Sequence, residues 1–209
     1  DTLTATGKEV TLDGGDENDH IYAYGYIDKE GSISYLEGGE ATVTGGAGDD
    51  YILVEHYETV NAEGGEGNDH LAHFRDIKGD VEVDGGNGDD RFGYFSNIEG
   101  DVKINAGAGN DRIGYDYDSY SGLSDIKGDV EVDLGHGDDF LNSRDTQGSL
   151  VIKGDQGKDN LKAHRGAKVD IDGGADDDTL YIYAFRDGQL SGGAGNDELT
   201  ASFHANPWN

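Results

Sequence analysis

The feature that most constrains the fold of this chain is a nine-residue string rich in glycine and aspartate, which recurs nine times. One clear copy reads GGAGDDYIL and starts at Gly45. Successive copies start 19 to 21 residues apart, except for two intervals of 31 and 28 residues. The copies start at Gly14, Gly45, Gly64, Gly85, Ala106, Leu134, Gly154, Gly173 and Gly192. A period near 20 residues is typical of a solenoid, in which each repeat forms one coil of a stack.

Two positions of the string keep their chemistry in every copy. The sixth position is always aspartate, at Asp19, Asp50, Asp69, Asp90, Asp111, Asp139, Asp159, Asp178 and Asp197. The eighth position is always large and apolar, at Ile21, Ile52, Leu71, Phe92, Ile113, Leu141, Leu161, Leu180 and Leu199. After the eighth position the residues alternate as in a strand, and a second short strand, such as the one at Val81 and Val83, precedes most copies. One coil is therefore predicted to run strand, short turn, strand, Gly–Asp turn.

The repeat predicts an all-β parallel β-solenoid of about nine coils, with two parallel sheets around a thin core. We expect residues 1–209 to form a single domain. The two longer intervals predict loop insertions near 25–36 and 115–122, which a solenoid tolerates because loop closure costs little more as a loop lengthens.

The aspartates create an electrostatic problem that the fold has to solve. The chain carries a formal charge of −30. Stacked turns would place the sixth-position carboxylates about 4.8 Å apart. Each adjacent pair would repel by ~3–4 kcal/mol at an effective dielectric constant near 20, and the sum over eight neighbours rivals the ~5–15 kcal/mol that stabilises a whole domain. Carboxylate and carbonyl oxygens are the ligands that calcium prefers, so we expect up to about eight Ca²⁺ ions between the turns.

Composition excludes several other classes of function. An acidic surface repels nucleic acid and anionic membranes, and no run approaches the ~18 apolar residues of a membrane span. There is no cysteine, hence no disulfide or thiolate metal site. The chain opens without a basic-then-apolar leader, so we expect any signal peptide to have been removed or never used. No nucleophile elbow, phosphate loop, dinucleotide fingerprint or zinc-protease motif occurs, and we predict that the chain is not an enzyme.

The string resembles the RTX (repeats-in-toxin) calcium-binding nonapeptide G-G-x-G-x-D-x-U-x, in which U is apolar. Four copies match it in full, and the resemblance covers about residues 14–203. It implies a right-handed parallel β-roll, calcium between successive turns, and secretion by a gram-negative bacterium with folding in external calcium. It also implies that the nine sixth-position aspartates are ligands. Backbone carbonyls would complete the sites near Gly45, Gly48, Gly64, Gly67, Gly85, Gly88, Gly192 and Gly195.

This chain departs from the family pattern in ways that bear on the sites. Typical members repeat the nonapeptide back to back, whereas here one copy occurs per coil, so we expect a single calcium row. Ala106 and Leu134 replace the first glycine, and Glu17 and Asp176 replace the later one. Lys158 places a positive charge beside Asp159. The C-terminal export segment expected of the family is missing, which indicates a fragment or a processed form.

Other side chains offer weaker candidates. His20 and His70 fall two coils apart, ~9–10 Å, which is too far for one zinc ion. The segment 116–122 resembles the start of an EF-hand loop but lacks its spacing, so a solvated loop is favoured. Strand alternation predicts that eight aromatic side chains face outward, either packing coil on coil or forming a binding face. They are Tyr22, Tyr24, Tyr51, Phe74, Phe95, Phe140, Tyr181 and Tyr183.

Two functions follow as hypotheses. The first is an extracellular or cell-surface structural and adhesive module that folds and stiffens on binding calcium and self-assembles end to end. The alternative is a calcium-dependent secretion and carbohydrate-binding module of a larger secreted enzyme. Ice binding is disfavoured because the third turn position does not carry the same Thr or Asn side chain from coil to coil, as a regular ice-binding surface would. The expected partners are calcium, a second copy of the chain and glycans, without nucleic acid or membrane insertion.

Overall fold

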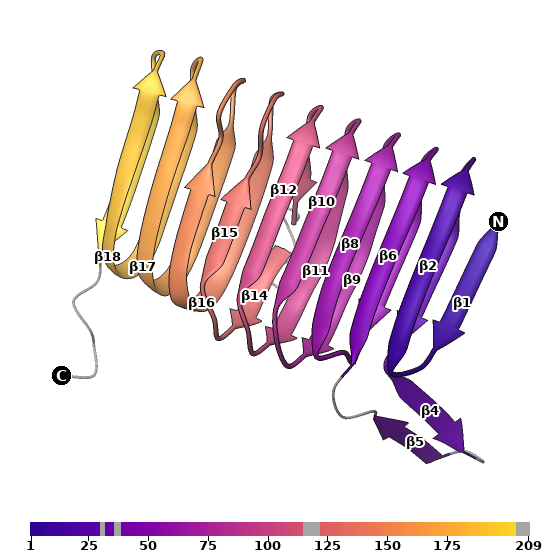
Figure 1. Cartoon of the computed structure of the whole chain (residues 1–209). Helices are drawn as coiled ribbons and strands as arrows, with labels where there is room; N and C mark the ends of the chain where they lie inside the picture. The colour runs from indigo at the N-terminus through magenta and orange to yellow at the C-terminus, as the bar shows by residue number, and fades with distance from the viewer. Residues whose placement is uncertain (30–31, 36–38, 115–121, 204–209) are drawn as a thin grey trace.

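The computed structural model describes residues 1–29, 32–35, 39–114 and 122–203. It is an all-β parallel β-solenoid of about nine turns (Figure 1). One sheet leads into the Gly–Asp turns and the other leads away from them. Among the described residues, no helix is long and apolar enough to span a membrane.

The strands follow the predicted order along each coil. In the first half of the chain they are β1 (Thr2–Thr6), β2 (Glu9–Asp16), β3 (His20–Tyr24), β6 (Glu40–Ala47), β7 (Tyr51–Glu55), β8 (Thr59–Glu66), β9 (His70–Ile77) and β10 (Val81–Asn87). The second half adds β11 (Arg91–Ile98), β12 (Val102–Ala108), β13 (Arg112–Ile113), β14 (Gly122–Ile126), β15 (Val130–Asp133), β16 (Phe140–Lys153), β17 (Asn160–Ala175), β18 (Thr179–Ala194) and β19 (Glu198–Phe203). The last long strands, β16 to β18, run from one sheet into the other.

The register confirms the repeat that the sequence predicts. Along β2, β6, β8, β10 and β12, the second residue of each string pairs with its equivalent in the next coil, as in Gly46 with Gly65. On the other sheet, Ile21 pairs with Ile52, and Ile52 with Leu71. All these pairings are parallel. Equivalent residues of successive coils therefore lie in columns that run along the stack.

The core is a thin layer between the two sheets. The eighth-position residues from Ile21 to Leu180 are all buried, at 0–1 % exposure, and they face buried Val and Ile side chains of the opposite sheet. Leu199 of the last coil is the exception, at 43 %. It has no following coil among the described residues to cover it.

The insertion predicted near 25–36 contains a second, small sheet. β4 (Tyr26–Lys29) and β5 (Ser32–Tyr35) pair antiparallel. This hairpin projects from the bottom of the stack in Figure 1. The second predicted insertion and the EF-hand-like segment fall on residues 115–121, which lie outside the described residues.

The prediction that all eight aromatic residues face outward is wrong for Phe74 and Phe95. Phe74 and Phe95 are fully buried and stack on each other, with ring centroids 4.8 Å apart. The strand register shifts between Ile52 and Leu53 opposite Ala72, so one extra residue there reverses the later alternation. Phe140 is buried because the Arg112 guanidinium and the Lys162 ammonium lie over its ring. The tyrosines remain partly or largely accessible.

Candidate functional site

The Gly–Asp turns form one edge of the solenoid, which we call the Gly–Asp edge, and glycine is required there for two different reasons. The second and fourth residues of the turn adopt positive φ, as at Gly46 (114°) and Gly48 (126°). Where a larger residue stands in the fourth place, the backbone moves closer to the ordinary left-handed region, with φ of 79° at Glu17 and 81° at Asp176. At the turns that begin with glycine, the first residue has no room for a side chain, because a Cβ on Gly64, for example, would stand under 3.0 Å from two oxygens.

Those two oxygens reveal how the turn is built. One is Oδ2 of Asp69, from the same turn, and the other is the backbone carbonyl oxygen of Gly85, the first residue of the next turn. The same arrangement recurs at the other glycines in the first place. It pairs Asp19 with Gly45, Asp50 with Gly64, Asp90 with Ala106, Asp159 with Gly173, and Asp178 with Gly192. A carboxylate oxygen and a carbonyl oxygen thus lie on the same side of each of these turns.

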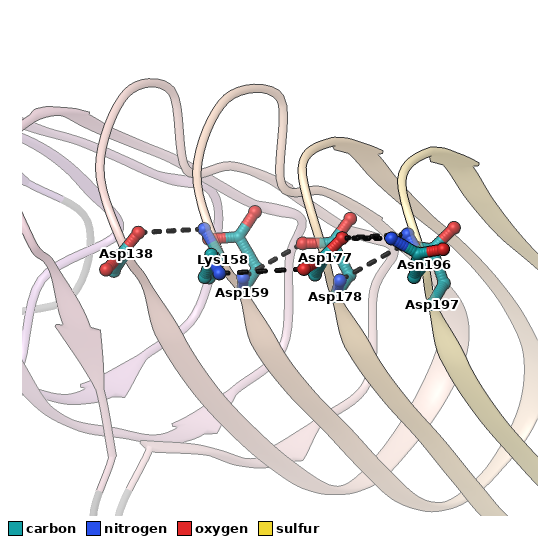
Figure 2. A network of polar contacts seen from close by, with 7 residues as sticks. All are labelled: Asp138, Lys158, Asp159, Asp177, Asp178, Asn196 and Asp197. Atoms are coloured by element: carbon teal, nitrogen blue, oxygen red, sulfur yellow. Dashed lines mark hydrogen bonds and ion pairs between the residues drawn. The ribbon is translucent and has the colours of Figure 1, made fainter.

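The sixth-position aspartates form a continuous ladder of hydrogen bonds. The backbone N–H of Asp19 donates to Oδ1 of Asp50 at 2.7 Å, and the N–H of Asp50 donates to Oδ1 of Asp69 at 2.8 Å. The pattern continues through every turn to Asp178 and Asp197, with distances of 2.6–3.0 Å. Figure 2 shows its last bonds, between Asp159, Asp178 and Asp197. The structure therefore brings all nine predicted aspartates into one line, which we call the inner ladder.

The second oxygen of these carboxylates has no partner. In the described part of the chain, Oδ2 is buried and without a hydrogen bond at Asp19, Asp50, Asp69, Asp90, Asp111, Asp139, Asp159 and Asp178. All eight residues are at most 2 % exposed. A buried polar atom without a partner costs free energy, and native structures contain few of them. A regular row of eight such oxygens indicates that something else satisfies them.

The donor set fits calcium better than other metals. Carboxylate and carbonyl oxygens face each other, which suits a hard cation. Within the described ranges, no group of three or more His, Cys, Asp or Glu side chains is arranged so that these side chains could hold a metal ion together. A cation at this edge would therefore take carboxylates from only one or two turns and complete its shell with backbone carbonyls, as at Gly45, Gly64, Gly85 and Gly192. The carbonyls of Gly48 and Gly67 lie instead against the fourth residue of the next turn.

Burial changes the acidity of the row. It raises the pKa of Asp69, Asp111 and Asp159 to about 6, of Asp90 to about 7 and of Asp139 to about 8. Hydrogen bonds from the preceding turn's N–H oppose this increase, and neighbouring carboxylates add to it. Without a cation, Asp139 is therefore mostly protonated at neutral pH and Asp90 partly so, whereas the groups with a pKa of about 6 take up protons only in mildly acidic solution. A bound cation favours the charged form and would displace those protons.

The predicted departures have visible consequences. Leu134 and Ala106 are fully buried in the first place of their turns, so an apolar side chain occupies the position that glycine leaves free elsewhere. The ammonium of Lys158 lies at the surface, 3.6 Å from Oδ2 of Asp177 in the next turn (Figure 2). Lys158 precedes Asp159 in sequence, but its ammonium group forms an ion pair with the exposed carboxylate of Asp177.

Sequence reasoning missed a second ladder immediately outside the first. The fifth residues of the turns also bond from coil to coil, as when the N–H of Asn68 donates to Oδ1 of Asp49 at 2.8 Å. Asp89 then donates to Asn68, and Asn110 to Asp89. The fifth residues are Asn18, Asp49, Asn68, Asp89, Asn110, Asp138, Lys158, Asp177 and Asn196. In this outer ladder every aspartate has only Asn or Lys as neighbours, an alternation that was readable in the sequence.

The start of the chain supplies a further rung that the motif search also missed. Thr2 pairs with His20 and Leu3 with Ile21, so Asp1 and Leu3 occupy the sixth and eighth positions of a turn. The amino group of Asp1 lies 2.8 Å from Oδ1 of Asp19, in the same relation as the other inner-ladder bonds. The signal was the DTLT at residues 1–4, which has the D-x-U-x half of the nonapeptide.

The histidines on the outer face pack with tyrosines. Tyr51 lies between His20 and His70, with ring centroids 5.6 and 5.1 Å away. Burial lowers the pKa of His70. These contacts account for the two histidines as parts of an aromatic cluster.

Comparison with known proteins agrees with the geometry of the turns. The model of the RTX calcium-binding nonapeptide repeat matches four segments, at residues 1–25, 37–53, 99–116 and 186–205. The chain carries RTX calcium-binding nonapeptide repeats. Neither the curated proteins nor the solved structures yielded a significant match. The five other RTX-like turns, between and beside the matched segments, share the register and the ladders of the matched ones. RTX repeats are typical of secreted bacterial proteins, and this chain is an RTX calcium-binding β-roll module.

Proposed function

We propose that residues 1–209 act as one extracellular module that a single row of calcium ions folds and stiffens. The ligands are the nine inner-ladder aspartates, together with backbone carbonyls of the turn glycines. The observation that carries the proposal is the row of eight buried Oδ2 atoms without partners. Each carbonyl–carboxylate pair beside a first-place glycine supplies oxygen ligands from two successive turns. An ion there ties one coil to the next.

Calcium binding then becomes folding energy. The ligands come from different coils, so a site exists only when the stack is formed, and the binding free energy adds to the free energy of folding. The uncompensated charge of −30 opposes compaction in the absence of ions. Secretion from a calcium-poor to a calcium-rich compartment would therefore switch the module from unfolded to folded, as the resemblance to RTX proteins of gram-negative bacteria implies.

We further propose that folded modules associate end to end and serve a structural or adhesive role. In the described part of the chain, β19 pairs with β18 and with no other strand, which leaves its outer edge open. Leu199 is 43 % exposed, whereas its equivalents in preceding coils are buried. A coil of a second copy placed there would continue both the sheet and the apolar column.

A calcium titration of chelator-stripped protein tests both parts, followed by far-ultraviolet circular dichroism and light scattering together. A cooperative rise in β signal supports calcium-coupled folding. A simultaneous, concentration-dependent rise in scattering supports end-to-end association, and its absence contradicts that part alone. Magnesium at the same concentration is the control, because its smaller, rigid octahedral shell suits carbonyl-rich sites poorly. An unchanged β signal across the calcium titration would falsify the proposed function.

A further inference from the structure

A shallow groove lies on the opposite edge of the solenoid, where β16, β17 and β18 bend from one sheet to the other. Its volume is about 840 Å³. Asp145, Thr146, Arg165, Tyr183 and Arg186 are among the residues that line it. It contains none of the inner-ladder aspartates. The groove is therefore separate from the proposed calcium row.

The groove lies in the least acidic part of the chain. Residues 144–186 contain seven of the fifteen Lys and Arg residues and eight aspartates, so this stretch is nearly neutral. The charged residues that line the groove are Arg165, Arg186, Asp125 and Asp145. The guanidinium of Arg165 is fixed by an ion pair with Asp145, at 2.9 Å. Arg186 is exposed and forms no ion pair with the described residues. A guanidinium presents donors in a planar fork that matches a carboxylate, so the groove offers a place for one.

An exposed aromatic ring lies beside these guanidinium groups. Tyr183 is 38 % exposed and, apart from Leu199, is the most exposed large hydrophobic side chain in the described ranges. Its ring is nearly parallel to that of Tyr181, at 10° and 6.5 Å, so the two tyrosines present aligned faces. A tyrosine combines an apolar face with a polar hydroxyl, which suits a ligand with both apolar C–H surfaces and hydroxyl groups.

A buried hydroxyl in the same groove lacks a partner. Thr146 is only 2 % exposed, and its Oγ1 atom has no hydrogen bond. A buried hydroxyl without a partner is uncommon, and an ordered water molecule beneath the groove surface would satisfy it. This observation is independent of the charge and of the aromatic ring, and all three concern residues that line one groove.

We propose that this groove binds a polysaccharide that carries carboxylate groups, such as a polyuronate. Tyr183 would pack against a sugar ring while Arg165 and Arg186 contact the carboxylate. The inference rests on the proposed adhesive function and gives it a ligand class. About eight bound calcium ions would reduce the formal charge from −30 to −14, so the calcium-loaded protein repels such a chain less than the free protein does, and the contacts in the groove have to outweigh the repulsion that remains.

The test measures binding of oligogalacturonate to the calcium-loaded protein by titration calorimetry, at fixed free calcium and ~0.15 M salt. Circular dichroism of the same samples reports whether each protein is folded. Y183A and R186Q should each weaken binding about tenfold, which corresponds to ~1.4 kcal/mol. The matched controls, Y22A and K103Q, change a tyrosine and a cation far from the groove and should bind like the parent. Cello-oligosaccharide, which is neutral, should bind more weakly than oligogalacturonate.

Three results would overturn the inference. The first is a folded, calcium-loaded parent that does not bind oligogalacturonate, which leaves the proposed calcium function intact. The second is undiminished binding by the R165Q/R186Q double variant, which would mean that calcium bridges the ligand to the acidic surface. The third is equal binding of inorganic sulfate and oligogalacturonate at matched charge, which would make the groove a simple anion site. A parent that fails to fold in calcium contradicts the proposed function and this inference with it.

Discussion

Aspartates bridge successive coils on both edges of this solenoid, but only one edge has the features of a cation site. On the return edge, opposite the Gly–Asp turns, the N–H of Asp101 donates to Oδ1 of Asp80 at 2.9 Å, and Asp129 donates to Asp101 at 2.8 Å. Ser149 continues this ladder at 2.7 Å. The bonds match those of the inner ladder in chemistry and length. The difference lies in what surrounds the second oxygen.

The return-edge bonds are exposed, whereas the inner ladder is buried. Solvent reaches the carboxylates of Asp80 and Asp101, but nothing in the described structure satisfies Oδ2 of Asp90 or Asp111. A hydrogen-bond ladder therefore does not by itself make a metal site. The inner ladder differs in that its Oδ2 atoms are buried without a partner and that, beside the first-place glycines, the carbonyl oxygen of the next turn lies near them. Substitutions on the two edges can separate the contribution of the inter-coil hydrogen bond from that of the buried second oxygen.

The largest effect is expected from a matched pair of alanine substitutions, one on each edge. D111A removes a proposed calcium ligand and leaves the buried N–H of Asp90 without its acceptor, which alone costs ~1–3 kcal/mol. Each lost ion costs a further ~2.7 kcal/mol when calcium is at about 100 times its dissociation constant. D101A removes only an exposed hydrogen bond, worth ~0.5–1.5 kcal/mol.

Urea unfolding at saturating and at tenfold lower calcium measures both effects. D111A should lose most of the calcium-dependent stability and show a less cooperative transition. D101A should keep the parent's dependence on calcium. Equal losses in the two variants would show that the edges do not differ in the way the burial suggests.

A second, intermediate effect concerns pH in the absence of calcium. Burial raises the pKa of Asp90 to about 7 and of Asp139 to about 8, from 3.8 in the unfolded chain. Between the unfolded and folded pKa values the folded chain holds protons that the unfolded chain has released, so stability falls as pH rises. The calcium-free protein should therefore be most stable near pH ~4 and lose that stability progressively up to pH ~8.

Far-ultraviolet circular dichroism in chelator at about pH 5 and pH 7.5 provides the measurement, and the β signal should be larger at the lower pH. In saturating calcium, urea midpoints at the same two pH values should show the reverse order, because protons and calcium compete for the same oxygens. A calcium-free protein that is more stable at the higher pH would contradict the assignment of the buried row.

The smallest effect is expected from the outer ladder. N110D inserts a further carboxylate between Asp89 and Asp138, which lie in the two adjacent turns, and it removes the amide N–H that donates to Asp89. Because these side chains are exposed, the loss should be ~1 kcal/mol or less, and it should shrink as salt is added. N110S, which is neutral, is the control for loss of the amide, and urea midpoints at low and high salt measure both variants. A loss that does not depend on salt would argue against charge as the reason for the alternation.

The repeat predicted the fold because its period gives the length of one coil, and its two invariant positions mark the turn and the core of that coil. Asp111 and Ile113 could be placed in the turn and in the core from the string alone. The reversal at Phe74 was missed because strict two-residue alternation was assumed. The spacing of three between Leu71, Phe74 and Ile77 is the trace of the bulge at Ala72. The unpartnered oxygens were also beyond sequence reasoning, because they depend on which way each carboxylate turns between coils. Asp1 and the alternating fifth positions were readable, but only once the register was known.

The alternation of the outer ladder also limits how this array can change in length. Deleting the coil that carries Asn68 would bring Asp49 next to Asp89, two carboxylates ~4.8 Å apart with a repulsion of roughly 1 kcal/mol even in water. Deleting that coil together with the next would instead join Asp49 to Asn110 and preserve the pattern. Gene duplication or recombination within this stretch would thus conserve the charge pattern when it adds or removes coils in pairs. The repeat that can be gained or lost without bringing two carboxylates together is therefore two coils long, although the structural repeat is one coil.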